Sequence, residues 1–273
     1  MVNVLGLNHV QLPQCLDDLI FKDIHAKYEP CGKDMVVLNW DNQKIIRYLG
    51  TYFPRSFSEA FCIFSKYFDL EKPKYSETST INVFDFGCGT GGELIGLLFA
   101  IAEKTNIQTV NIKALDGNQN ALRQLEAIID KLKTEFRMDV RYNVTPIKID
   151  DVYDMSLTSE LIREDNDIIL IFKSICEMAS VRQFEERNPY QHVLQILQSK
   201  LAPNGIICLA DVTSFNAEQK EWLPMMIDKA CINANANILM RNDGYNEVFY
   251  VSHSGKRCDK SKITWRILNN KKS

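Results

Sequence analysis

The stretch that most constrains this chain is residues 81–100, INVFDFGCGTGGELIGLLFA, in which four glycines separate two apolar runs. The first run, residues 81–86, is short and rich in β-favouring residues, so it predicts a buried strand. The second run follows Gly92 and is long enough for a helix. Glycine tolerates a positive φ and lets a ligand approach the backbone closely. The stretch therefore predicts a strand, a tight turn and a helix whose N-terminus faces a nucleotide-like ligand.

The glycine spacing alone leaves the ligand open, because similar turns bind NAD, FAD and S-adenosylmethionine. Asp85 lies two residues before Gly87, and a carboxylate there suits the ammonium group of a methionine moiety better than a pyrophosphate. The pattern DxGxGxG from Asp85 also differs from GxGxxG, although Gly92 makes a GxGxxG pattern from Gly87 formally possible. A glycine-rich structural turn without a ligand is the alternative.

The segment VFDFGCGTGG resembles the first motif of the class I S-adenosylmethionine-dependent methyltransferases. A second segment, LAPNGIICLADV at residues 201–212, closely resembles the turn and fifth strand of the same family. The resemblance covers about residues 81–268 in order and spacing. It implies S-adenosylmethionine as the cofactor and S-adenosylhomocysteine as the product. The first motif binds the cofactor in this family, which implies that role here for Asp85, Gly87, Gly89 and Gly91.

From residue 81 onward, strand-like runs alternate with helical stretches, an order typical of a parallel sheet with helices on both faces. Two late strands, residues 247–253 and 263–268, follow one another without a helix and predict an antiparallel pair at the sheet edge. A dinucleotide-type dehydrogenase would continue the βαβ order instead. With the resemblance, the expected fold class is α/β: a seven-stranded Rossmann-like methyltransferase sheet, mostly parallel with an antiparallel edge strand. The other strands are expected at residues 81–86, 109–115, 140–149, 167–172 and 206–211.

Polar residues follow the second and third expected strands, where ligands of open α/β sheets bind. Asp116 comes 25 positions after Gly91, near the spacing at which a carboxylate accepts hydrogen bonds from ribose hydroxyls. The resemblance implies this role for Asp116, with Gly117 beside it, whereas capping of the next helix is the alternative. The resemblance also implies that Ile149 and Asp150 flank the adenine. An ordinary acidic loop is the equal alternative there.

The fourth expected strand is almost wholly apolar, as a strand buried on both faces should be. Phe172 and Lys173 at its carboxyl end are expected beside the cofactor, and Ser174 beside the methyl acceptor. Glu177 is the first candidate for a general base and His192 a weaker one, with Lys173 also expected at the catalytic position. A plain ion pair between Lys173 and Glu177 is the alternative. The segment departs from the Asn-Pro-Pro-Tyr type of motif used on DNA bases, which disfavours such a substrate.

Residues 1–80 show no βαβ order and are expected to form a helical N-terminal cap, followed by a methyltransferase domain at residues 81–273. The polar stretch 71–80, which contains a proline, is the expected boundary. We expect the cap to close over the cofactor and to form one wall of the acceptor pocket, because its aromatic residues would otherwise be exposed.

Helical spacing in this part predicts helices at residues 16–28 and 42–52. Pro54 is expected to end the second of these, and a Ser-x-x-Glu capping box at Ser56 to open a third. The third helix carries so many aromatic residues that one of its faces is expected to be buried in a core.

Two residues near Pro54 are candidates for substrate binding. Arg55 lies close in sequence to Tyr52, and an arginine there can form a bidentate pair with a carboxylate of the cofactor or of a substrate. A surface arginine paired with Glu59 or Asp69 is the alternative. Arg55 and Tyr52 are therefore predicted to contact the substrate.

Composition indicates the compartment and excludes some kinds of site. The eight cysteines are scattered without a CxxC pair, and several lie in apolar stretches, so they predict buried free thiols in a reducing cytoplasm. Four histidines without ligand clusters argue against a metal site. No apolar run approaches the roughly 20 residues that span a bilayer, and the N-terminus lacks a secretory signal. A cytoplasmic protein without a membrane partner is expected.

The net charge of −3 conceals a basic C-terminal segment. Residues 254–273 carry seven basic residues and one acidic residue, a charge of +6, which leaves −9 for the rest of the chain. The favoured interpretation is that these charges protect an unpaired strand at the sheet edge from aggregation. The competing one is a patch that holds the phosphates of an RNA acceptor. Aromatic platforms for RNA bases are scarce, with only Trp265 nearby.

Together these observations predict an S-adenosylmethionine-dependent methyltransferase that acts on a small-molecule acceptor. An RNA or protein acceptor is an alternative, with RNA held through the basic C-terminal segment. A cofactor-binding protein without catalysis and a fold relative such as a polyamine synthase are further alternatives.

Overall fold

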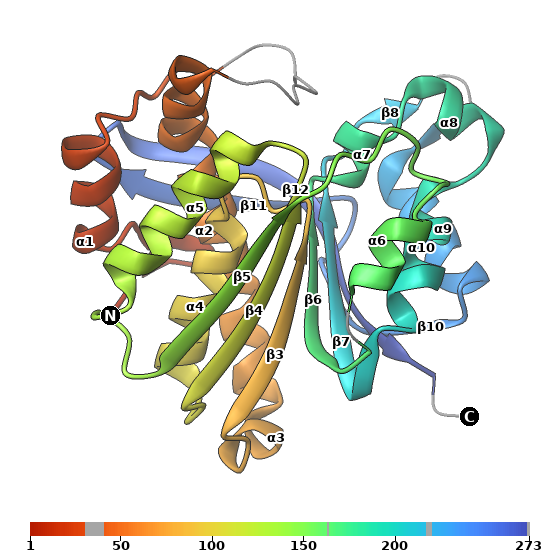
Figure 1. The fold of residues 1–273 in the computed structure, drawn as a ribbon, viewed down its shortest axis with the longest axis horizontal. Coiled ribbons are helices and arrows are strands. Elements are labelled where there is room, and N and C mark those ends of the chain that lie inside the picture. Colours follow the sequence, from red (N-terminus) through yellow and green to blue (C-terminus); the bar gives the residue numbers. More distant parts are fainter. Residues whose placement is uncertain (31–40, 163, 217–219, 272–273) are drawn as a thin grey trace. The chain divides into compact units, whose positions relative to one another are not determined.

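The computed structural model describes residues 1–30, 41–162, 164–216 and 220–271. The chain is an α/β protein with a mostly parallel central sheet and antiparallel edge strands, as expected, and its described residues contain more strands than the seven predicted (Figure 1). It divides into two compact units, each built from segments distant in sequence. Unit 1 comprises Met1–Ile81, Cys88–Pro146 and Val248–Ser261, and unit 2 comprises Asn82–Gly87, Ile147–Glu247 and Lys262–Ser273.

Unit 1 contains two sets of paired strands. β4 and β5 are parallel and pair over their full lengths. β1 is antiparallel to β2, and β2 is parallel to β11. The elements of this unit are β1 (Asn3–Gly6), β2 (His9–Gln11), α1 (Gln14–Asp17), the π-helix η1 (Asp18–Asp23), α2 (Asn42–Leu70), α3 (Lys72–Ser76), α4 (Gly92–Lys104), β4 (Thr109–Asp116), α5 (Gln119–Leu132), β5 (Asp139–Pro146), most of β11 (Glu247–His253) and the start of β12 (Lys256–Asn270).

The helix α2 runs for 29 residues straight through Pro54, where the sequence predicted an end and a new start. Its beginning is capped by Asp41, whose carboxylate accepts a hydrogen bond from the Lys44 N–H at 2.8 Å. Ser56 is buried inside the helix, so the predicted capping box at this residue is wrong. The aromatic face is buried, as predicted, with Phe57 fully inaccessible.

Two glycines let α2 and α4 lie in direct backbone contact, which Figure 1 shows as two neighbouring helices. A Cβ on Gly92 would lie 2.6 Å from the Phe53 carbonyl oxygen, and one on Gly96 would lie 2.4 Å from that of Phe57. The ring of Phe57 meets Phe99 of α4 edge-on at 5.5 Å. Because Phe53 and Phe57 lie on either side of the proline and both contact α4, packing holds the helix together across Pro54.

The first 30 residues are less helical than expected. β1 and β2 were not predicted, and the helix expected at residues 16–28 is only α1 and η1, which end at Asp23. Within the expected polar linker, α3 buries Tyr75, whose ring meets Phe68 edge-on at 4.9 Å. Unit 1 joins residues 1–81 with later segments, and a separate cap domain at residues 1–80 stays a prediction.

Unit 2 is built on parallel strands with an antiparallel partner. β3 pairs in parallel with β6, and β6 with β7. β12 is antiparallel to β7, and β10 is antiparallel to β12, so β10 points the same way as β7. The loops that follow β3, β6, β7 and β10 therefore leave the same edge. The elements are most of β3 (Thr80–Phe86), α6 (Ser156–Leu161), β6 (Asn166–Phe172), α7 (Ile175–Met178), α8 (Val181–Glu186), α9 (Pro189–Gln198), β7 (Leu201–Asp211), β8 (Phe215–Asn216), β9 (Glu221–Trp222), α10 (Leu223–Asn233), β10 (Ala236–Arg241) and the rest of β12.

Most predicted strands lie within two residues of those observed, and three predictions need correction. β5 ends at Pro146 rather than at residue 149, because proline has no N–H to donate to a strand ladder. The loop expected at residues 254–262 is a two-residue turn, and β12 already begins at Lys256. β7 begins at Leu201, five residues before the start expected at residue 206.

Over the described ranges, no helix is both long enough and apolar enough to cross a membrane. The seven cysteines in these ranges are free thiols, of which Cys258 is exposed rather than buried. Cys31 lies outside the described residues.

Replacing Gly96 by alanine tests the contact between α2 and α4. Alanine favours helices by about 1 kcal/mol over glycine, but its Cβ would collide with the Phe57 carbonyl. We expect the free energy of unfolding to fall by about 1–3 kcal/mol in urea denaturation. The matched control is Ala102→Gly on the exposed side of α4, which should cost about 0.5–1 kcal/mol. Greater stability in Gly96→Ala would contradict the contact.

The imidazole of His253 is a buried group without hydrogen bonds to the described residues. It stacks on Phe21 with ring centroids 4.9 Å apart, and both of its nitrogens are inaccessible and unpaired. Burial lowers the pKa of His253 to about 4, although Asp259 and Asp17 act in the opposite direction. The native protein therefore holds this histidine neutral at pH values where an unfolded chain would protonate it.

This pKa shift makes stability depend on pH. An unfolded histidine has a pKa near 6.5, so only the unfolded state gains a proton between about pH 6.5 and 4, and stability falls as the pH is lowered through this range. At pH 5 the loss from His253 should be about 2 kcal/mol relative to pH 7. Urea denaturation at both pH values measures it. The variant His253→Phe should lose this part of the pH dependence, and an unchanged dependence would contradict the assignment.

Candidate functional site

The glycine turn adopts the left-handed conformations that its sequence predicted. Gly87, Gly89 and Gly91 have φ values of 71°, 49° and 76°. Backbone hydrogen bonds close the turn, from Cys88 N–H to the Leu115 carbonyl at 3.1 Å and from Gly91 N–H to the Cys88 carbonyl at 2.7 Å. Because a side chain rarely adopts such φ values, this backbone path requires glycine at all three positions.

Asp116 holds the turn in place. One carboxylate oxygen accepts the Gly89 N–H at 2.7 Å, and the other accepts the Asn118 N–H at 2.7 Å, across Gly117. Burial raises the pKa of Asp116, while these two backbone donors oppose the shift. Asn118, rather than Asp116, caps α5 by accepting from the N–H groups of its first turn. The contact of Asp116 with a ribose stays a prediction.

The glycines serve different purposes in unit 1. A Cβ on Gly91 would lie 2.3 Å from the Leu125 side chain, so this glycine is needed for packing. Among the described residues, a Cβ on Gly89 would meet nothing closer than the hydroxyl of Tyr48, at 3.8 Å. The described part of the chain therefore leaves space above the Gly89 backbone, directly before the N–H groups that begin α4.

Arg55, expected at a substrate or cofactor carboxylate, binds a carboxylate of the chain itself. Its guanidinium donates to both oxygens of Asp259, at 2.6 and 3.0 Å, and lies 5.5 Å from the ring of Tyr52. The alternative partners Glu59 and Asp69 are therefore wrong. Tyr28 donates to the same Asp259 at 3.0 Å. Roles of Arg55 and Tyr52 in substrate binding stay predictions, and the observed role of Arg55 is to anchor β12.

In unit 2, the turns after β3 and β6 lie against each other. Asp85 is fully buried one strand residue before the end of β3. A Cβ on Gly87 would lie 2.5 Å from the Cβ of Ser174, so only glycine permits this approach. Phe172 is buried at the end of β6, and the hydroxyl of Ser174 is buried without a hydrogen-bond partner among the described residues.

Lys173 has a φ of 53°, which is strained for a residue with a side chain. Its N–H donates to the Ala210 carbonyl at 2.7 Å, which fixes the backbone at the carboxyl end of β6. Strain of this kind is often kept where a ligand or a reaction requires it. The sequence had pointed to Lys173 by position, but not to its conformation.

The two candidates for a general base lie on different helices. Glu177 is in α7, and its N–H donates to the Ser174 carbonyl at 3.2 Å. His192 is in α9 and meets the ring of Tyr153 edge-on at 5.4 Å. Its Nε2 is buried without a partner in the described ranges, and burial lowers the pKa of this histidine. Of the two, Glu177 is placed directly after the turn that carries Lys173.

The residues expected beside the adenine follow β5 in an irregular segment. Asp150 is exposed and pairs with Lys148 at 2.5 Å. Ile149 is half-buried beside it. This placement matches the ordinary acidic loop that was the alternative, and contact with the adenine stays a prediction.

Asp211 is a polar residue of unit 2 that the sequence analysis did not single out. It is fully buried at the end of β7 and accepts hydrogen bonds from the Tyr190 hydroxyl at 2.9 Å and the Cys176 N–H at 3.2 Å. Burial raises the pKa of Asp211, opposed by these donors. It thereby ties β7 to α7 and α9. The sequence signal that could have identified Asp211 is an acidic residue at the end of an apolar strand.

Three exposed aromatic residues also escaped the sequence analysis. Phe215 and Trp222 pair across β8 and β9 with ring centroids 4.9 Å apart, and Tyr245 meets Trp222 at 5.5 Å. Their exposed fractions are 48%, 43% and 39%. They lie in the loops after β7 and β10, at the edge where Lys173 follows β6, and Figure 1 places β8 and α7 at that end of unit 2.

No family model matches the chain, and no curated protein matches it. Among solved structures, a S-adenosylmethionine-dependent methyltransferase from Clostridium acetobutylicum is 14% identical, covers 76% of this chain and 90% of its own, and has a TM-score of 0.44. Precorrin-6y C5,15-methyltransferase from Geobacter metallireducens is 12% identical, with coverages of 74% and 86% and a TM-score of 0.43. A Pyrococcus horikoshii protein, provisionally described as an RNA methyltransferase, is 12% identical, with coverages of 95% and 98% and a TM-score of 0.46. The likeness is one of fold.

Replacing Lys173 by glycine tests the strain at the end of β6. Glycine adopts a φ of this kind without penalty, whereas alanine does not. We expect Lys173→Gly to be more stable than Lys173→Ala by about 1 kcal/mol in urea denaturation. Equal stability of the two variants would show that the backbone here is not strained.

Proposed function

We propose that this protein is an S-adenosylmethionine-dependent methyltransferase. The observation that carries the proposal is the left-handed glycine turn at the start of α4, which Asp116 ties to the end of β4. A turn of this kind leaves backbone N–H groups and a partial positive charge facing a ligand. The fold and the motif that resembles methyltransferases agree with it.

The residues present fit this cofactor. The described residues leave the backbone above Gly89 open, as close approach of a ligand requires. Each oxygen of the Asp116 carboxylate accepts one backbone N–H and has further lone-pair capacity for a ribose hydroxyl. When bound, S-adenosylmethionine supplies a methyl group that is already activated by a positively charged sulfur. The chain then has to position the acceptor and exclude water.

The residues that follow the carboxyl end of β6 are our candidates for positioning the methyl acceptor. Ser174 keeps a buried hydroxyl without a partner in the described ranges, and the hydrogen bond from the Lys173 N–H to the Ala210 carbonyl restrains this turn. Glu177 follows within one helical turn and is our candidate to take a proton from an acceptor that needs deprotonation. We assign to Ser174 the alignment of the methyl acceptor and to Glu177 the uptake of a proton from it.

We favour a small-molecule acceptor with a flat, apolar part. Phe215, Trp222 and Tyr245 support this choice, because exposed aromatic rings at the carboxyl edge offer faces on which a planar group can stack. A nucleobase of an RNA acceptor is the alternative, since stacking tolerates any ring. Trp222 should report either ligand by quenching of its fluorescence.

The role of Asp116 in cofactor binding can be measured by calorimetry with S-adenosylhomocysteine. We expect Asp116→Ala to weaken binding by about 1–3 kcal/mol, because acceptors for ribose hydroxyls and the anchor of the turn are both lost. Asp116→Asn keeps one carbonyl acceptor and should fall between this variant and the wild type. The matched control is Asp130→Ala on α5, whose carboxylate pairs only with nearby surface groups.

Absence of S-adenosylhomocysteine binding by the wild-type protein would overturn the proposed function. Binding without release of S-adenosylhomocysteine from S-adenosylmethionine, for any small acceptor tested, would favour a non-catalytic binding protein. Unchanged affinity in Asp116→Ala would remove this residue from the cofactor site.

A further inference from the structure

The basic hairpin of β11 and β12 does not have the role that the sequence favoured. Its charges were expected to protect an unpaired edge strand, but β11 pairs in parallel with β2, from Tyr250 with His9 to Ser252 with Gln11. That interpretation is wrong, because this strand has a partner. The charges at the hairpin, Lys256 and Arg257, therefore need another explanation.

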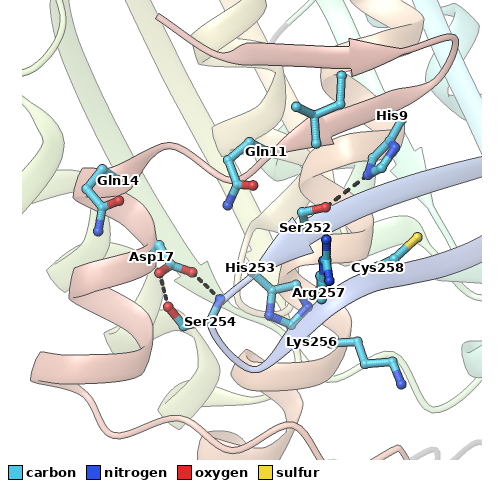
Figure 2. A pocket seen from close by; sticks show the side chains of 11 residues that line it. His9, Gln11, Gln14, Asp17, Ser252, His253, Ser254, Lys256, Arg257 and Cys258 are labelled. Carbon is cyan, nitrogen blue, oxygen red and sulfur yellow. Dashed lines mark hydrogen bonds between the residues drawn. The ribbon is translucent and has the colours of Figure 1, made fainter.

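These two residues line a pocket within unit 1 (Figure 2). Its volume is about 910 Å³, and His9, Gln11 and Asp17 lie on its other walls. Such a volume is in the range of sites that hold nucleotide-sized ligands. Figure 2 shows Arg257 and Cys258 close to Ser252, with Lys256 nearer the turn of the hairpin.

Three of the polar side chains of this pocket, those of Asp17, His9 and Ser252, are already hydrogen-bonded. Asp17 accepts hydrogen bonds from the backbone N–H of Ser254, at 2.8 Å, and from its hydroxyl. His9 and Ser252 are linked at 3.0 Å through Nε2 and Oγ. Asp17 is thus occupied in holding the hairpin turn, as the dashed lines of Figure 2 show.

Within the described ranges neither Lys256 nor Arg257 forms an ion pair, whereas Arg55 binds Asp259 and Arg266 binds Asp228. The ammonium of Lys256 lies 5.8 Å from the ring of Tyr28, which does not neutralise it. Arg257 lies beside Ser252, whereas the ammonium of Lys256 points away from Gln11 (Figure 2). Among the described residues that line the pocket, the one carboxylate, that of Asp17, is already hydrogen-bonded.

Hydrogen bonds and a ring contact hold the hairpin on both sides of its turn. Asp259 follows the basic pair by two residues and accepts from Tyr28 and Arg55, while Asp17 holds the other side of the turn. His253 is stacked on Phe21 directly before the turn. A backbone that is fixed in advance reduces the entropy lost when a ligand binds.

We infer that this pocket binds a phosphate group, through the guanidinium of Arg257 and the amide of Gln11, while the ammonium of Lys256 adds positive charge beside it. Arginine suits a phosphate because its planar fork donates two hydrogen bonds at once. The phosphate can belong to an RNA strand or to a free phosphorylated molecule. The inference rests on unit 1 alone and is independent of the proposed methyl transfer.

Cys258 provides a direct test, because it lines the pocket and is the exposed thiol of the described chain. The full-length protein is treated with N-ethylmaleimide, and alkylation of the Cys258 peptide is followed by mass spectrometry. The probes are inorganic pyrophosphate and single-stranded oligouridylate of about 10 nucleotides. We expect at least one probe to slow alkylation, and the effect to weaken with added salt.

Substitutions then assign the effect to residues. Arg257→Gln should weaken protection about tenfold or more, since it removes a charge-assisted hydrogen bond, and Lys256→Gln should weaken it less, since its ammonium only adds charge nearby. The double variant should lower the salt slope for RNA by about 0.7 or more. The control, Lys131→Gln with Lys133→Gln, removes the same charge from exposed positions near the end of α5. Both groups of side chains are at the surface, so unfolding of the variants is not expected.

Protection by pyrophosphate alone would identify a free phosphorylated ligand, and protection by RNA at far lower concentration would identify an RNA strand. Either supports the site. Absence of protection by both probes, or equal protection in the double variant and the control, would overturn it.

Discussion

The hydrogen bonds of the Asp116 carboxylate are the interaction on which the proposed site depends. They join the glycine turn at Gly89 to the start of α5 at Asn118. A turn with several left-handed residues is costly to order, because glycine loses more backbone freedom on folding than any other residue. Two charge-assisted hydrogen bonds to one buried carboxylate offset part of that cost. The turn is therefore held in its ligand-accepting shape by the chain itself.

The helix α2 links this turn to the basic hairpin within unit 1. Near its beginning, Tyr48 lies beside Gly89. Further along, Arg55 reaches Asp259 at the start of β12. Contact with α4 through Gly92 and Gly96 keeps the helix continuous in spite of Pro54. One rigid element thus supports both the candidate cofactor turn and the pocket that we assign to a phosphate.

Predictions from the sequence succeeded where the signal was local. The apolar runs that became β3 and β6 were recognised from a few residues, because a strand buried on both faces contains little else. The left-handed glycines followed from the absence of a Cβ. Predictions failed where distant segments decided the outcome. The helix α2 passes through Pro54 because α4 packs on both sides of it, and Arg55 has a partner that lies 204 positions away.

The sequence by itself determined the strand, turn and helix around the glycines, the α/β order and the place of Asp116, since each depends on φ preferences or on periodicity over a few residues. Only the tertiary structure decided that β2 pairs with β11, that the Tyr190 hydroxyl donates to Asp211, and that Arg257 lines a pocket without an ion pair to the described residues. Such features depend on which segments meet in space. Strand pairing and burial depend on these contacts between distant segments, so no short stretch of sequence specifies them.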